Sequence, residues 1–174
     1  MTISDSKILL RAPEPADLDT LFLLENATPL AEAGFATAPL SRFELSRYIE
    51  SYSADIYSER QLRLMIVDRD SGRTVGAIDI TDYEPRDRRG FVGIAILETE
   101  RAKGFATAAL SLLCGYASQV LGMHQLAAQI AYDNEASRRL FERCGFKTCG
   151  SMRRWIRRGR SYADALLYQR IFEG

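Results

Sequence analysis

The chain has 174 residues, a length that fits one domain with a hydrophobic core of its own. Hydrophobic residues make up 47% of it and charged residues 26%, as is usual in globular proteins. Lysine and arginine together number 23, as do aspartate and glutamate, so no overall charge draws the protein to nucleic acid or to a membrane.

The first half of the chain predicts a strand, two helices and three antiparallel strands. Residues 8–11 (ILLR) form a short strand, and Pro15 begins a helix with apolar residues at i, i+3 and i+4 spacing. Ser41 and Glu44 form a capping-box pattern at the start of a second helix. The turn sequence DRDSG indicates a hairpin between the first two of the three strands. These strands are expected at residues 62–67, 74–83 and 91–97.

The second half predicts two helices that alternate with strands. A long apolar helix spans residues 105–121 and stops at Gly122, and a strand follows at residues 126–131. A short helix at residues 135–143 has Asn134 as its N-cap, and two strands joined near Gly159 end the chain. Hairpins combined with crossover helices predict an α+β fold, with a mixed, mostly antiparallel sheet flanked by helices in a single domain, residues 1–174.

Other composition signals argue against membranes, metals and disulfides. No window approaches the ~18 consecutive apolar residues of a membrane helix. The cysteines are only Cys114, Cys144 and Cys149, and His124 is the only histidine, so no metal-ligand spacing is present. We therefore expect reduced thiols, no bound metal and a cytoplasmic protein.

The stretch ERAKGFATAAL (residues 100–110) joins a predicted strand to the long helix. The first turn of a helix presents unpaired N–H groups and a partial positive charge, which suit a phosphate. Gly104 and Ala106 leave room for it, while Arg101 and Lys103 add charge. The stretch predicts either an anion site or a tight turn with two solvated cations. A Rossmann site fits poorly, because G-x-A-x-x-A replaces G-x-G-x-x-G and antiparallel hairpins precede it.

Two motifs together resemble the GNAT family of N-acetyltransferases. Residues 101–106 (RAKGFA) are similar to the family's pyrophosphate loop, Gln/Arg-x-x-Gly-x-Gly/Ala. Residues 134–146 (NEASRRLFERCGF) are similar to its later helix, Asn-x-x-(Ala/Ser)-x-x-Leu-(Tyr/Phe)-x-x-x-Gly-Phe. The RimJ/RimL-type ribosomal-protein N-terminal acetyltransferases and spermidine N-acetyltransferase are the most similar branches. They share an opening seen here as Leu10-Arg11 and Asp17-Leu18.

The resemblance covers essentially the whole chain and implies acetyl-CoA as co-substrate, an amine as acceptor and the GNAT fold. It also implies that subunits pair, so we expect a homodimer or a higher homo-oligomer. The backbone before the loop, the loop itself and the start of the later helix are implied to bind CoA. These residues are Ile94, Ala95, Ile96, Arg101, Ala102, Lys103, Gly104, Phe105, Ala106, Thr107, Asn134 and Ser137.

The catalytic residues are less closely matched. Many family members protonate the departing thiolate with a tyrosine at the position of Phe141, which has no proton to donate. Ser137, one turn earlier, matches a serine of the RimJ/RimL branch and is the candidate acid; otherwise it is an ordinary helix serine. Tyr132 is a second candidate. Asp79, on the same predicted strand as Asp82, is the candidate base or holds the cationic amine, unless it lies on a solvated strand face.

The acceptor amine is left open by the sequence. Its specificity is expected in residues 26–42, where the chain has one acidic residue, Glu32, between positions 29 and 40, unlike the acid-rich spermidine enzymes. The alternatives are a protein N-terminal or small-molecule amine, a polyamine, or an acyl-CoA-binding module without catalysis. The arginines near the C-terminus indicate a solvated hairpin or subunit contact rather than an RNA, ribosome or acidic-substrate site: Arg153, Arg154, Arg157, Arg158 and Arg160.

Overall fold

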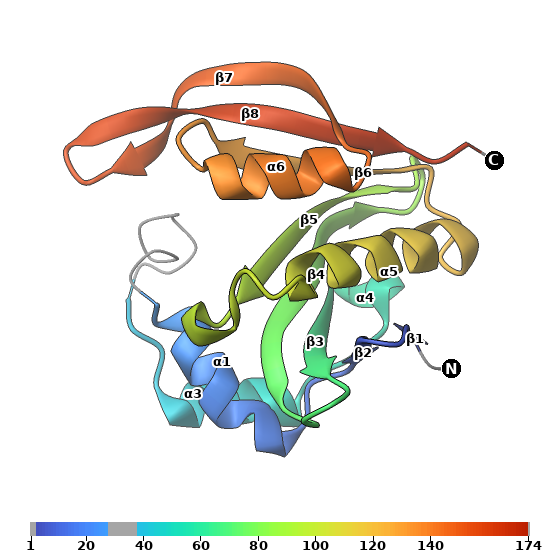
Figure 1. Cartoon of the computed structure of the whole chain (residues 1–174), viewed down its shortest axis with the longest axis vertical. Coiled ribbons are helices and arrows are strands. Elements are labelled where there is room, and N and C mark those ends of the chain that lie inside the picture. The colour runs from blue at the N-terminus through green and yellow to red at the C-terminus, as the bar shows by residue number, and fades with distance from the viewer. Residues whose placement is uncertain (1–2, 28–37, 174) are drawn as a thin grey trace.

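Eight strands form one sheet among the residues that the computed structural model describes, which are 3–27 and 38–173. Their order in the sheet is β1-β2-β3-β4-β5-β6-β8-β7 (Figure 1). Only β5 and β6 run parallel, so the expected mixed, mostly antiparallel sheet is confirmed. The strands are β1 (Ile3–Ser4), β2 (Ile8–Arg11), β3 (Leu62–Asp68), β4 (Thr74–Glu84), β5 (Arg89–Ile96), β6 (Gln125–Ala131), β7 (Lys147–Arg158) and β8 (Ser161–Ile171).

Helices cover both faces of this sheet. They are α1 (Leu18–Glu25), α3 (Arg42–Glu50), α4 (Ile56–Glu59), α5 (Phe105–Gln119) and α6 (Glu135–Arg143), with the 3-10 turns η1 (Pro15–Asp17) and η2 (Glu98–Glu100). On one face, α1 and α3 bury Leu21 and Leu45 against Met65 and Ala77 of the sheet. On the other face, the long helix α5 packs its apolar side against the larger core cluster, which includes Ile78. Burial of these side chains is the main force that holds the layers together.

The parallel pair β5–β6 is short. Its register covers only Arg89 to Phe91 on β5 against Gln125 to Ala127 on β6. Both strands then continue, β5 still paired with β4 and β6 with β8. In Figure 1 the two strands lie together on the side of the C-terminus and separate toward the opposite side. The sheet therefore opens between β5 and β6, and β5 gains a free edge.

Several boundaries differ from the sequence prediction. β1 and α4 were not expected, because two and four residues are too few to show a period. The predicted polar link at residues 84–89 is a tight hairpin, because Glu84 and Arg89 pair and extend both strands. The helix predicted to reach residue 121 ends at Gln119. Most of the proposed specificity segment, residues 28–37, lies outside the described residues.

The C-terminal hairpin of β7 and β8 projects beyond the other strands (Figure 1). Its arginines lie on β7 and at the turn, mostly exposed, and Arg158 is 3.5 Å from Asp133. Cys114 and Cys144 are buried and Cys149 is exposed, all three as free thiols. No helix within residues 3–27 and 38–173 has both the length and the apolar character needed to cross a membrane.

Candidate active site

The free edge of β5 is the first part of the site. Ile94, Ala95 and Ile96 pair with β4 on one side, while β6 has already diverged after Phe91. An unpaired strand edge presents a row of N–H and C=O groups that another extended chain can bind. All three residues are partly exposed. These are three of the residues predicted from the sequence to bind CoA.

The second part is the turn that follows β5 and opens α5. Ala102 and Gly104 have positive φ values of 61° and 83°, and Gly104 is the N-cap of α5. No side chain caps this helix, and its first turn contains no acidic residue. The N–H groups of Phe105, Ala106 and Thr107 therefore remain available to donate hydrogen bonds to a ligand. A left-handed Ala102 is unusual for a residue with a Cβ, and strained backbone of this kind clusters at ligand-binding and active sites.

The cations of this turn are arranged differently from the sequence expectation. Lys103 pairs with the buried carboxylate of Glu100 at 2.8 Å, and Arg73 approaches the same carboxylate at 3.3 Å. Arg101 folds back, and its Nε donates to the Ile96 carbonyl at 3.3 Å. Lys7, which the sequence did not indicate, lies with its Nζ 5.1 Å from the centre of the Phe105 ring. Only the folded chain brings Lys7 to the start of α5.

The start of α6 is the third part. Asn134 caps this helix, because its Oδ1 accepts the N–H of Ser137 at 3.1 Å. Ser137 is half-buried. Phe141 is 2% exposed and packs edge-to-face on Phe146, with 5.0 Å between the ring centres. It is therefore a core residue. Tyr132 is 59% exposed and stacks under the Arg138 guanidinium. Of these residues, only Ser137 and Tyr132 carry a hydroxyl near the end of β6.

The α5 and α6 starts both follow the carboxyl ends of neighbouring parallel strands. Such ends meet at the same edge of a sheet, where α/β proteins commonly bind ligands. The two helices also touch, since the Cys144 thiol lies 3.9 Å from the Thr107 carbonyl and from the Ser111 hydroxyl. Cys144 is the C-cap of α6, so this contact joins the end of α6 to the first turns of α5. The start of α6 follows the end of β6, beyond the point at which β5 and β6 separate.

Asp79 belongs to an ion cluster on the face of the sheet that α1 and α3 cover. Its Oδ1 and Oδ2 accept from Nε and Nη2 of Arg63 at 2.8 and 2.9 Å. Nη1 of Arg63 donates to Glu25 at 2.6 Å. All three side chains are about one-quarter exposed. Asp82 is at a bulge with φ 49° and is exposed, apart from this cluster.

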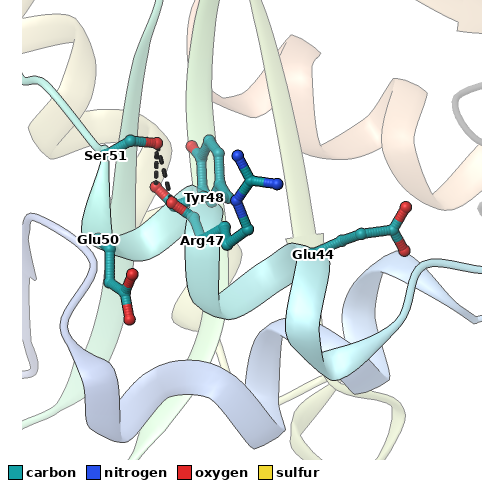
Figure 2. A pocket seen from close by; sticks show the side chains of 5 residues that line it. All are labelled: Glu44, Arg47, Tyr48, Glu50 and Ser51. Carbon is teal, nitrogen blue, oxygen red and sulfur yellow. Dashed lines mark hydrogen bonds between the residues drawn. The ribbon is translucent and has the colours of Figure 1, made fainter.

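Two tyrosines border the cluster. Tyr52 donates its hydroxyl to the Arg63 carbonyl at 2.5 Å, and burial raises the pKa of Tyr52 to about 12. Burial also raises the pKa of Tyr48, whose ring centre is 5.6 Å from the Arg63 guanidinium. Tyr48 lines a cavity of about 100 Å³ together with Arg63, Asp79 and Thr81. It also lines a more open depression of about 430 Å³ along α3, shown in Figure 2 with Glu44, Arg47, Glu50 and Ser51.

The described part of the chain contains no group of three or more His, Cys, Asp or Glu side chains placed to hold a metal ion. The site therefore combines the free edge of β5, the uncapped start of α5, which can bind an anion, the Ser137 hydroxyl and the charged cluster around Arg63. These parts suit binding of a long phosphorylated carrier and a polar partner.

Known proteins resemble this chain in sequence and in fold. The family described as "Acetyltransferase (GNAT) domain" matches residues 7–147. The chain is 28% identical over 167 residues to "Uncharacterized N-acetyltransferase YoaA" of Bacillus subtilis (strain 168), covering 87% of this chain and 93% of that protein. A spermidine N-acetyltransferase from Vibrio cholerae, solved with CoA and spermine, has a TM-score of 0.84 at 23% identity over 96% of both chains. RimL, a ribosomal L7/L12 alpha-N-protein acetyltransferase solved with coenzyme A, has 0.84 at 17% identity, covering 99% of this chain and 98% of that chain.

Proposed function

The chain belongs to the GNAT family of acetyltransferases, and from this membership we propose that it transfers the acetyl group of acetyl-CoA to a primary amine. One observation carries the proposal. The unpaired edge of β5 leads through the turn at residues 97–104 to the uncapped start of α5. The edge suits the amide-rich pantetheine arm, and the helix start suits the diphosphate of the same molecule. One continuous stretch of backbone thus matches two adjoining parts of CoA, the pantetheine arm and the diphosphate.

The proposed reaction is a direct attack in a ternary complex. An amine of lysine type, with a pKa of about 10.4, first loses a proton. The neutral nitrogen then attacks the thioester carbon, so a C–N bond forms and the carbonyl oxygen becomes an oxyanion that needs N–H donors. The oxyanion then re-forms the C=O bond as the C–S bond breaks, the nitrogen loses its second proton to give the amide, and the CoA thiolate takes up a proton. Holding both reactants in line contributes roughly 7–11 kcal/mol toward lowering the barrier.

Named residues take these roles in the proposal. Those backbone groups of residues 94–96 that face the free edge of β5 bind the oxyanion and the pantetheine arm. Asn134 contributes a polar contact to that arm, and Ser137 protonates the thiolate, directly or through a water. Asp79 holds the incoming ammonium. We assign Asp79 this electrostatic role because both of its oxygens already accept hydrogen bonds from Arg63.

A charge placed in the first turn of α5 tests the cofactor site. Thr107→Glu puts a carboxylate at the helix start, where it favours the helix but repels a diphosphate. We expect CoA at 100 times its Kd to stabilise the wild-type protein by about 2.7 kcal/mol, and Thr107→Glu hardly at all. Thr107→Gln, of the same size but neutral, should keep most of the effect. The measurement is urea unfolding with and without CoA, and strong stabilisation of Thr107→Glu would place the diphosphate elsewhere.

A screen of amines tests the reaction itself. Acetyl-CoA is offered with polyamines, N-terminal peptides and small primary amines, and CoA thiol release is followed together with acetylated product. Product from at least one amine supports the transferase. CoA binding without product from any amine would instead favour an acyl-CoA-binding module, a second candidate that the buried, hydroxyl-free Phe141 motivates.

A further inference from the structure

Arg63, Asp79 and Gly93 form one row across three neighbouring strands. Arg63 is the partner of Asp79 between β3 and β4, and Asp79 is the partner of Gly93 between β4 and β5. Directly paired residues point to the same face of a sheet. Two residues along each strand, Met65 and Ala77 form the adjacent row on the same face, and this row is buried under α1 and α3. The row therefore runs from the ion cluster to the strand whose far edge is free.

Gly93 leaves this row without a side chain at its last position. A Cβ at Gly93 would have no atom within 4 Å. The residue is exposed, and its φ is not in the left-handed region, so the backbone does not require glycine there. Its neighbours on the same face of β5, Phe91 and Ala95, both carry side chains and are partly buried. Packing therefore does not explain why residue 93 has no side chain. A ligand that passes over β5 would explain it, because the ligand would need this space.

The cluster at the other end of the row is negatively charged overall. Arg63 provides one positive charge, and Asp79 and Glu25 provide two negative charges. Because burial raises the pKa values of Tyr48 and Tyr52, both phenols are uncharged at neutral pH. An ammonium group is attracted to such a cluster and a carboxylate is repelled. Paired Cα atoms on adjacent strands are about 5 Å apart, so the cluster lies within one side-chain length of β5.

On the basis of the proposed acetyl transfer, we infer that the acceptor amine reaches the thioester over Gly93, with its ammonium held by Glu25 and Asp79. Gly93 is then a specificity-determining residue, because its missing side chain is the space that the acceptor occupies. Glu25 and Asp79 act by positioning the cation before it loses its proton. Because the cluster is negatively charged overall, it also favours an acceptor with a further positive charge over one with a carboxylate.

The first test fills the gap with a single methyl group. Gly93→Ala adds a Cβ in open space, so folding is preserved, but acceptor kcat/KM should fall roughly 10- to 200-fold, as one methyl group does in a close-fitting site. The KM for acetyl-CoA should not change. Gly150→Ala is the matched control, since this β7 glycine also has room, with only Leu167 Cδ1 at 3.8 Å from the added Cβ. If both variants behave alike, the acceptor does not pass over Gly93.

The second test concerns the charge, with cadaverine and 6-aminohexanoate as probe acceptors. Both present a primary amine on five methylene groups, and they differ only in the charge of the far end. We expect cadaverine to have the higher kcat/KM in the wild-type protein. Glu25→Gln should lower the ratio of the two kcat/KM values about fivefold, the effect of one charge at about 4 Å in water. Glu59→Gln, an exposed control on α4, should preserve it. An equal or reversed preference in the wild-type protein would overturn the charge selection.

These outcomes separate the route from the reaction. If no amine is acetylated by the wild-type protein, the proposed function fails. If cadaverine is acetylated at the same rate by wild-type, Gly93→Ala and Gly150→Ala proteins, the transferase stands and only the route is wrong. The Glu25→Gln variant keeps an oxygen for Arg63 Nη1, so a loss of fold is not the expected cause of its effect.

Discussion

At the scale of single residues, the hydroxyl of Ser137 carries the mechanistic proposal. The Asn134 cap binds the backbone N–H of residue 137, not its side chain. Ser137→Ala therefore keeps the cap, and alanine favours a helix. We expect kcat to fall about 10²- to 10⁴-fold, the contribution of a general acid, while acetyl-CoA affinity stays nearly constant. The check is to measure kcat with one good acceptor by steady-state kinetics, and to measure the affinity of the same protein for acetyl-CoA.

Two further variants make the Ser137 result interpretable. Ser118→Ala changes a serine near the far end of α5 and should leave turnover unchanged. Tyr132→Phe removes the other exposed hydroxyl near the end of β6. Full activity of Ser137→Ala with a loss in Tyr132→Phe would transfer the acid role to Tyr132. A loss confined to acetyl-CoA affinity would make Ser137 a cofactor ligand.

Charged residues inside strands show what can be predicted from residue types. Asp79 was predicted as a site residue because a carboxylate suits a strand poorly. Arg63 interrupts the apolar run of β3 in the same way, but it was not predicted as its partner. Their contact depends on the register of β3 against β4, which brings the two residues directly opposite one another. A residue's type therefore signals that a partner exists, while only the pairing of strands says which residue it is.

At the scale of elements, Asp17 joins three segments. It is 1% exposed and accepts hydrogen bonds from Arg11 at the end of β2, from Thr74 at the start of β4 and from the N–H of Glu14. Burial opposes its ionisation, but these hydrogen bonds outweigh burial and hold the pKa of Asp17 below its ordinary value. Arg11 and Asp17, which were named from the sequence as part of a shared opening, thus link β2 to the η1 turn that precedes α1.

This link predicts a pH-dependent loss of stability. Because the pKa of Asp17 is lower in the folded than in the unfolded chain, its contribution is complete above the unfolded value near pH 3.9 and is lost as pH falls through the folded value. Asp17→Asn should cost about 1–3 kcal/mol at pH 7, and the difference from wild type should shrink near pH 3. Urea unfolding at several pH values measures this. Asp19→Asn, an exposed control, should change little, and a pH-independent gap for Asp17→Asn would contradict the assignment.

The elements also differ in how far the sequence predicts them. Helix α6 has the predicted ends, because Asn134 caps it and Gly145 with φ 82° follows it, and both signals are local. The two long C-terminal strands and the hairpin at residues 84–89 depend on pairing between strands. The opening between β5 and β6 is also a matter of pairing. No local pattern marks the residue at which β5 leaves β6, so this central feature of the site came only from the structure.

At the scale of the whole molecule, the short β5–β6 pairing holds together the two parts of the sheet. Gly90 is at its centre, opposite Leu126. A Cβ on Gly90 would lie 2.9 Å from Ile80 Cγ2, 3.2 Å from the Thr81 carbonyl oxygen and 3.3 Å from Met123 Cε. These neighbours leave no room for a methyl group without a shift of the surrounding core. The short pairing next to the opening is therefore closely packed at Gly90.

Gly90→Ala is expected to weaken both the fold and the site. Overpacking of a buried position costs about 1–3 kcal/mol, so urea unfolding should occur at a lower concentration than in the wild-type protein. The free edge belongs to β5, whereas the start of α6 follows β6. A shift of β5 relative to β6 should therefore separate the two parts of the site and lower CoA affinity. Gly93→Ala, three residues along the same strand, is the matched control, because its added Cβ meets no atom and should change neither quantity. If Gly90→Ala unfolds at the wild-type urea concentration, the junction can adapt, and the geometry of the opening must be fixed instead by the contacts of α5 with α6.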